Sequence, residues 1–185
     1  MTQNKFQFGQ KAVARLAKWF APTPKNAFRP SGMFHIQHIR DGKIINEFDA
    51  ANGVTNGGLD NILEVAFNAG TQITIWYLGL INDPATLAVA DTMAAHAGWT
   101  ENTAYTEANR ITIAFDTAAS QAVANGTTSA DFSINGAGTI HGVFVPSINT
   151  KGGSTGFLWA TAPFAAPLAV TGGDLLEVTY TVSGS

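Results

Sequence analysis

Residues 76–115, WYLGLINDPATLAVADTMAAHAGWTENTAYTEANRITIAF, decide most of what this sequence says about its fold. The stretch opens with one apolar segment and closes with a second, residues 110–115, and both patterns are typical of β-strands. About 28 residues connect them, a length that is uncommon in a compact domain unless the loop's own contacts order it or a partner binds it. The sequence therefore predicts two strands joined by a long, ordered loop.

The connecting loop contains side chains that can order it, but no arrangement suited to catalysis. Asp91 offers a local turn or helix cap. Trp99 and Tyr105 can anchor the loop by burying their rings on the sheet, and Glu101 can pair with Arg110 at the start of the next strand. The candidates for ordering the loop or for contacting a partner are Asp91, His96, Trp99, Glu101, Tyr105 and Arg110.

Outside this stretch, alternating apolar residues and turn signals predict a β-rich domain. Residues 33–40 and 43–48 form a predicted hairpin, because Asp41-Gly42 readily adopts the positive φ angles of a type I′ turn. Clusters of Gly, Asn, Ser and Pro separate the other segments. The further predicted strands are residues 72–81, 110–115, 130–134, 139–145, 156–162 and 175–182.

One short helix is predicted within this domain, over residues 59–67. Asn56 can serve near its start, and Gly70 follows its end. Its apolar side consists of Leu59, Ile62, Leu63, Ala66 and Phe67. Eight or so strands with one helix favour an antiparallel β-sandwich, with a jelly roll slightly ahead of an immunoglobulin-like arrangement.

The composition supports a globular domain. Of the 185 residues, 45% are hydrophobic and 12% are charged, which argues against disorder. The chain has no cysteine, so disulfide bonds and thiolate metal sites are excluded. No apolar run reaches the 18 or more residues that a membrane span needs, and we expect no membrane partner.

Charge divides the chain into a basic N-terminal arm, residues 1–30, and an acidic domain, residues 31–185. Six basic and no acidic residues occur up to Arg29, whereas four basic and thirteen acidic residues follow, a net charge of −9. Residues 10–20 show the apolar spacing of an amphipathic helix, with Val13, Leu16, Ala17 and Phe20 on one side. Pro22 and Pro24 end this helix. The arm's candidate partner-binding residues are Lys11, Val13, Arg15, Leu16, Lys18, Trp19 and Phe20.

The arm has several possible roles. It can reach a neighbouring subunit or pack on its own domain, and the sequence does not decide between these two. An acid-poor amphipathic helix is also shared by mitochondrial transit peptides and by segments that bind nucleic acids or anionic membranes. The expected partners are another protein and further copies of this chain, not nucleic acid or membrane.

The remaining residues contain no motif for catalysis or cofactor binding. His35 and His38 lie three apart on a predicted strand and should point to opposite faces, so they cannot chelate one ion together. His96 and Asp91 make at most two ligands. No nucleophile elbow and no phosphate-binding loop is present. We therefore expect no catalytic residue, no metal and no cofactor, and a protein that is not an enzyme.

The order WYLGLI, ADTMAAHAGWTE, AY and then NR leading into a strand resembles a family of small virion proteins of tailed bacteriophages. The similarity covers residues 52–115, and ADFSINGAGTIHGVFV at 130–145 matches in its general β character. Members of this family are head decoration (cement) proteins or other minor structural proteins.

The resemblance implies a β-sandwich that binds the outside of an assembled capsid and reinforces contacts between subunits of the major capsid protein. It also implies a homo-oligomer, often a trimer, located on the virion surface after assembly in the host cytoplasm. Two alternatives stay open. One is another virion component of the tail, fibre or head–tail junction. The other is a carbohydrate-binding sandwich or adhesin, with Trp99, Tyr105 and Trp159 as exposed aromatic candidates.

Overall fold

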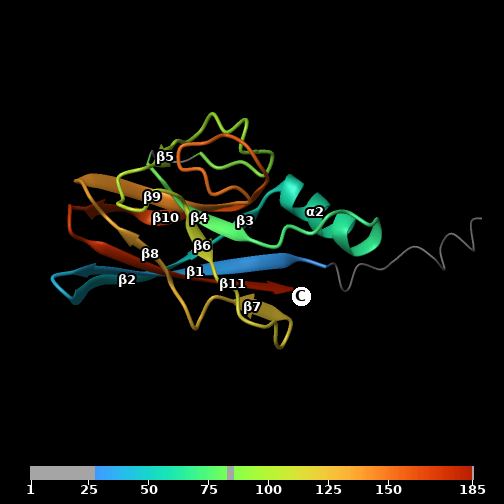
Figure 1. Ribbon diagram of the computed structural model, residues 1–185, viewed down its shortest axis with the longest axis horizontal. Helices are drawn as coiled ribbons and strands as arrows, with labels where there is room; N and C mark the ends of the chain where they lie inside the picture. Colours follow the sequence, from blue (N-terminus) through green and yellow to red (C-terminus); the bar gives the residue numbers. More distant parts are fainter. Residues whose placement is uncertain (1–27, 83–85, 185) are drawn as a thin grey trace, which may run out of the picture.

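The computed structural model describes residues 28–82 and 86–184, so the predicted helix at residues 10–20 lies outside the described part of the chain. Within that part, strands form two antiparallel sheets that face each other, and one helix, α2, projects at one end (Figure 1). This confirms the predicted mainly-β, two-sheet architecture.

The first sheet is built around the first and last long strands of the domain. β1 pairs along its length with β11, from Pro30 opposite Gly184 to Ile39 opposite Leu175, and with β2 on its other side. The last strand, β11, also pairs with two short strands at different positions. The strands of this sheet are β2 (Lys43–Ala51), β1 (Pro30–Arg40), β11 (Leu175–Gly184), β7 (Ala122–Ala124) and β8 (Ala130–Ser133).

The second sheet is built around a hairpin of two long strands, β9 and β10. β4 adds to the β9 side, and two short strands pair with opposite ends of β4. Its strands are β3 (Gly53–Val54), β10 (Leu158–Val170), β9 (Gly138–Pro146), β4 (Trp76–Ile81), β5 (Glu101–Asn102) and β6 (Ile111–Ile113). β3 follows β2 directly, so the chain crosses from one sheet to the other near Asn52.

The main hydrophobic core lies between the sheets. Along β1 the burial alternates with period two, so Phe34, Ile36 and His38 point inward whereas His35 is on the other face. Phe34 stacks on Tyr180 with ring centroids 4.0 Å apart. The expectation that His35 and His38 point to opposite faces is confirmed.

The predicted hairpin is confirmed. Asp41 and Gly42 have φ angles of 51° and 71°, and they connect β1 to β2. These are the two positive angles that a type I′ turn requires.

Helix α2 (Asn56–Phe67) begins earlier than predicted, and its cap is Thr55 instead of Asn56. Thr55 is buried; its Oγ1 accepts from Gly58 N at 3.0 Å and donates to the Leu158 carbonyl of β10 at 2.5 Å. The helix start is therefore fixed to the second sheet, while Gly70 N donates to the Glu64 carbonyl after its end. Figure 1 shows α2 at the end of the sandwich where β1 starts and β11 ends.

Other predicted boundaries need correction. The strand predicted at 72–81 occupies Trp76–Ile81 alone, because residues 72–74 cross the end of the sandwich and line a cavity there. The strand predicted at 110–115 is confined to Ile111–Ile113, while β10 and β11 extend beyond their predicted ends. Among the described residues, no helix is long and apolar enough to cross a membrane.

Candidate functional site

Two regions of the sandwich are candidates for function. The first is the loop cluster, defined as residues 86–110 and 147–157, which covers the outer face of the second sheet around β4 and β9 (Figure 1). The second is the α2 end, defined as the helix with the surface of the sandwich beside it. The loop cluster contains the residues that the sequence singled out.

Trp99 anchors the loop cluster in a small hydrophobic core of its own. Its ring is 3% exposed and packs against Phe144 of β9, with centroids 4.8 Å apart. Asp91 Oδ2 accepts hydrogen bonds from Trp99 Nε1 at 3.1 Å and from Ala88 N at 3.0 Å. His96 stacks on Trp99 with centroids 3.9 Å apart, and its Nδ1 lies 3.0 Å from the Trp99 carbonyl. These contacts fix the turn around the ring.

Arg110 ties the two loops of the cluster together. Its guanidinium is almost fully buried and donates to both carboxylate oxygens of Glu101, from Nε at 3.0 Å and from Nη2 at 2.7 Å. It also donates to the carbonyls of Ile148 and Gly153, at 2.9 and 2.6 Å. The guanidinium carbon lies 5.1 Å from the centroid of the Phe144 ring. The charge is therefore paired, hydrogen-bonded and covered, as a buried guanidinium must be.

Tyr105 belongs to the core between the sheets instead of to the outer face. Its ring packs edge to face on Phe132, with centroids 5.1 Å apart, and burial raises the pKa of its phenol. Lys151 Nζ lies 4.2 Å from the centroid of the Tyr105 ring and donates to the backbone carbonyls of Tyr105 and Glu107. The Tyr105 ring and the Lys151 ammonium support the loop, because both make contacts within the domain.

The structure thus brings five of the six loop candidates together on the outer face and places Tyr105 in the core. The three aromatic residues proposed for glycan binding, Trp99, Tyr105 and Trp159, are all buried. The three candidates are therefore not exposed aromatic residues, because their rings belong to the two cores, although Trp159 also lines the cavity at the α2 end. The arm candidates Lys11, Val13, Arg15, Leu16, Lys18, Trp19 and Phe20 lie outside the described residues.

At the opposite end of the sandwich from α2, the buried carboxylate of Asp174 lies among several hydrogen-bond partners. Asp174 accepts from Arg40 at 2.7 and 2.8 Å and from Thr171 N at 2.8 Å, and its Oδ2 lies 2.8 Å from His38 Nε2. Chiefly because of the hydrogen bonds from Arg40, the pKa of Asp174 lies far below its ordinary value. The partners saturate this carboxylate, so these contacts join β1 to the turn before β11. No group of three metal-ligating side chains occurs within residues 28–82 and 86–184.

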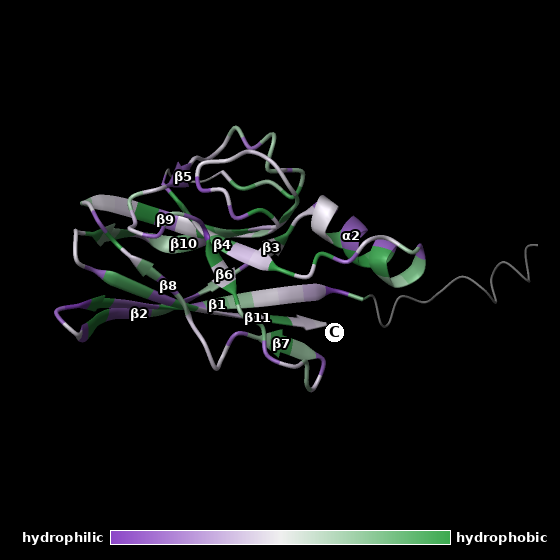
Figure 2. Cartoon of the chain, in the orientation of Figure 1, coloured by the Kyte–Doolittle hydropathy of each residue, from purple (hydrophilic) through white to green (hydrophobic). Residues whose placement is uncertain are grey.

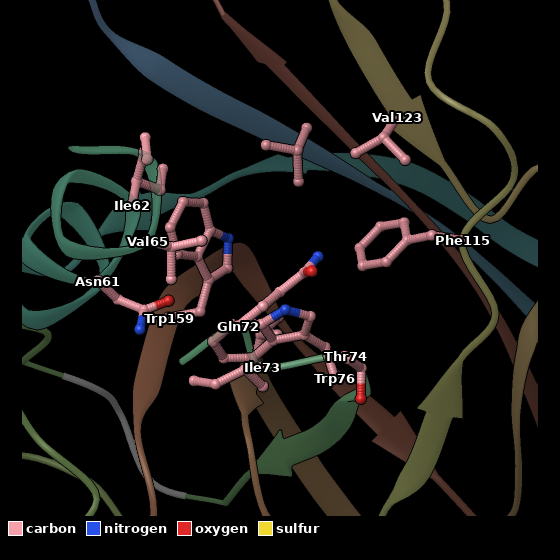
Figure 3. Close-up of a pocket in the computed structure, with 13 residues that line it drawn as sticks. Asn61, Ile62, Val65, Gln72, Ile73, Thr74, Trp76, Phe115, Val123 and Trp159 are labelled. Atoms are coloured by element: carbon pink, nitrogen blue, oxygen red, sulfur yellow. The ribbon is translucent and has the colours of Figure 1, made fainter. Parts of the chain in front are cut away.

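The α2 end, in contrast, is hollow and apolar. A cavity of about 460 Å³ opens between α2, the segment before β4 and the edges of both sheets. Figure 3 shows Ile62 and Val65 of α2 on one side of it, and Phe115 and Val123 on the opposite side. Trp76 and Trp159 lie against it, with ring centroids 6.0 Å apart. Its size is in the range of about 300–1,000 Å³ in which proteins bind ligands and apolar groups.

A second cavity, of about 440 Å³, continues the first towards the start of the described chain. The two cavities share the side chains of Ile62, Val123 and Val182. Phe28, the first described residue, and Gly184, the last, line the second cavity. We call the two cavities together the end hollow.

The outer side of α2 is also apolar and uncovered. Leu59, Leu63 and Phe67, spaced four residues apart on one stripe, are exposed, and Phe67 is 83% exposed. Val89 is exposed beside the start of the helix, where its carbonyl accepts from Asn56 N. Figure 2 shows hydrophobic colour towards the C-terminal end of α2. We call Leu59, Leu63, Phe67 and Val89 the outer stripe.

Charge at the α2 end is mainly acidic. Asp60 and Glu64 are exposed on the helix, and Asp116 lies next to Phe115 of the end hollow. Of the basic residues in the described ranges, Arg29 is the one near this end. The other four, Arg40, Lys43, Arg110 and Lys151, belong to the opposite end of the sandwich or to the loop cluster.

The sequence did not reveal the end hollow, although a signal for it was present. The predicted apolar side of the helix contains more large side chains than a single contact with a sheet can bury, and in the structure only Gly58 of α2 is fully buried. Comparison with known protein families and with curated proteins finds no match for this chain.

Proposed function

We propose that this chain is a non-enzymatic decoration (cement) protein of a tailed-phage capsid, which binds the outer surface of the shell of major capsid protein and stabilises it. The observation that carries the proposal is the outer stripe, in which three large apolar side chains of the projecting helix α2, and Val89 beside the start of the helix, are exposed. The resemblance of residues 52–115 to small virion proteins suggests the major capsid protein as the partner.

An exposed apolar helix face of this kind marks a protein contact. Folded monomers rarely leave contiguous large apolar side chains in water, and those that do so commonly use them for association. Phe67 and Leu63 have the size and exposure of interface anchors. A capsid repeats each site many times, so a decoration protein that contacts several subunits gains avidity from modest individual contacts.

The finer features of the proposal extend this role. The basic arm, residues 1–30, supplies steering towards an acidic shell surface, while residues 31–185 form the sandwich. The protein acts as a homo-oligomer, a trimer in keeping with the resemblance, on the surface of the virion. It uses no cofactor and binds neither nucleic acid nor membrane. The jelly-roll connectivity and the helical arm remain predictions.

The test is co-sedimentation of the purified full chain with expanded capsids assembled from the major capsid protein, at low and high salt. We expect saturable binding at a fixed ratio per shell subunit that persists in high salt, because apolar anchors are not screened. Phe67→Thr should weaken binding at least tenfold. Ile44→Thr replaces an equally apolar exposed residue on β2, away from α2, and should leave binding unchanged.

Absence of binding to every form of the capsid would overturn the proposal. In that case, binding to tails or to head–tail complexes that is lost in Phe67→Thr would assign the outer stripe to another virion component. Equal capsid binding by Phe67→Thr and Ile44→Thr would show that α2 is not part of the interface.

A further inference from the structure

We propose that the end hollow is the docking site for the chain's own N-terminal arm, which inserts the apolar side of residues 10–20 between α2 and the sheet edges. The docked arm would extend the proposed partner-binding end with a basic surface. The inference itself concerns the isolated protein and does not depend on capsid binding.

The position of the described chain start supports this occupant. Phe28 lines the second cavity, so the arm leaves the domain at the mouth of the end hollow. Seven residues, 21–27, separate Phe28 from the predicted helix at residues 10–20. Seven extended residues span at most roughly 25 Å. A tether this short holds the helix at an effective concentration on the order of millimolar, which favours docking within one chain.

The apolar surfaces match in kind and in size. The predicted helix places Val13, Leu16, Ala17 and Phe20 on one side and, at eleven residues, is about 16 Å long. The end hollow consists of two joined cavities of about 460 and 440 Å³ whose walls are mainly aliphatic and aromatic. Filling it would bury both the arm's apolar side and the rings of Trp76 and Phe115.

The charges match in sign. Lys11, Arg15 and Lys18 occupy the more polar side of the predicted helix. Asp60 and Glu64 are exposed on α2, and Asp116 follows Phe115, which lines the end hollow. A docked arm would therefore bring its cations to the end of the domain that carries these three acidic side chains, which adds a favourable charge interaction to the apolar contact.

Cross-linking of cysteine pairs in the full chain tests this placement, and the chain contains no cysteine that would interfere. Ala17→Cys is combined in turn with Ala66→Cys, Ala118→Cys or Ala166→Cys. Ala66 and Ala118 line opposite parts of the end hollow, whereas Ala166 is exposed on β10 towards the other end of the sandwich. A short bismaleimide is added to dilute protein, and the products are identified by mass and by peptide mapping.

We expect cross-linking within one chain to be at least roughly tenfold faster for Ala66→Cys or Ala118→Cys than for Ala166→Cys, because docking raises the local concentration of the arm. Equal rates for all three pairs would mean a free arm and would overturn the proposal. Products that join two chains and increase with protein concentration would show arms exchanged between copies, which also overturns it.

Thermal unfolding of arm variants gives a second measurement. Leu16→Gln places a polar amide on the apolar side and should lower the Tm by about 4–8 °C, whereas Ala14→Gln on the polar side should change it by less than about 2 °C. Equal Tm values for the two variants would contradict docking. Because both tests use the isolated protein, a failure to bind capsids leaves their outcome unaffected.

Discussion

The loop cluster and the α2 end look alike in the sequence and differ in the structure. Both contain aromatic residues, large aliphatic residues and charges. In the loop cluster the residues around Trp99 and Arg110 satisfy one another, because Trp99 is buried on Phe144 and Arg110 is paired with Glu101, although Val89, Ile148 and Phe157 are exposed. At the α2 end such residues do not satisfy one another, because Phe67 and Leu63 are exposed and a cavity lies behind the helix.

This difference separates residues that maintain the fold from residues available for partners. A buried arginine with two carboxylate contacts and two carbonyl contacts uses four of its five N–H groups to hold the loops together. An exposed phenylalanine on a projecting helix contributes little to the stability of the monomer. The most conspicuous motif in the sequence is therefore largely internal structure, whereas the plainer helix leaves large apolar side chains exposed.

The largest expected effect comes from opening the loop cluster with Arg110→Met. The substitution leaves Glu101 with an unpaired, nearly buried carboxylate and leaves the carbonyls of Ile148 and Gly153 without their donor. We expect the free energy of unfolding to fall by about 3–5 kcal/mol, measured by urea denaturation. Lys43→Met at the exposed hairpin should change it by less than about 0.5 kcal/mol. Similar values for the two variants would show that the loop cluster does not contribute to global stability.

A second prediction concerns acid and the buried carboxylate at the other end of the sandwich. The pKa of Asp174 is far below its unfolded value of about 3.9, chiefly because Arg40 donates to it. A lowered pKa in the folded state stabilises the protein above the unfolded pKa, so unfolding free energy should be lost as the pH falls below about 4. Asp174→Asn should cost about 2–4 kcal/mol at pH 7 and should flatten the acid limb of the profile.

The control for this pH profile is Asp131→Asn, because Asp131 is exposed on β8. It should keep the acid limb and the stability at pH 7. If Asp174→Asn loses stability in acid as steeply as the unaltered chain, other carboxylates cause the acid effect.

The third prediction concerns the attachment of α2. A Cβ on Gly58 would lie 2.6 Å from the carbonyl oxygen of Trp159, so Gly58→Ala should push the helix off β10 and cost about 1–3 kcal/mol. The neighbouring Gly57 is the matched control, because a Cβ there meets nothing closer than 3.9 Å. Gly57→Ala should stabilise the protein by about 0.5–1 kcal/mol through the lower entropy of its unfolded chain.

Urea denaturation of Gly58→Ala and Gly57→Ala, each compared with the unaltered chain, measures these two changes in the free energy of unfolding. If both glycine variants are stabilised, the close contact between α2 and β10 is not maintained in solution.

Which parts of the fold could be predicted depends on how far apart in the sequence the interacting residues are. Local rules were sufficient for the β1–β2 hairpin, where Asp41-Gly42 determines the turn, and for the existence of α2. The cap was missed although its bond from Gly58 N to Thr55 is local, because Gly57 and Gly58 are poor helix formers and the prediction began the helix at Leu59. The second bond of Thr55, to the Leu158 carbonyl, was not predictable because that acceptor is 103 residues away in the chain.

The same reason explains the errors in the candidate site. The apolar run 72–81 satisfies the pattern of a buried strand, but pairing with β6 and β9 is available from Trp76 onward. β5 and β7 are two and three residues long, and their pairing partners are distant in sequence. The end hollow is a space between elements, so neither periodicity nor spacing could locate it.

The smallest expected effect on stability belongs to the outer stripe, and it gives the sharpest contrast with the loop cluster. Phe67→Thr removes a ring that is 83% exposed and should change the free energy of unfolding by less than about 0.5 kcal/mol. The same substitution should abolish most of the capsid binding, since the ring is available to a partner. Arg110→Met should show the reverse, a large loss of stability with binding retained by the molecules that remain folded. A large loss of stability in Phe67→Thr would mean that another part of the protein covers the stripe in the free state.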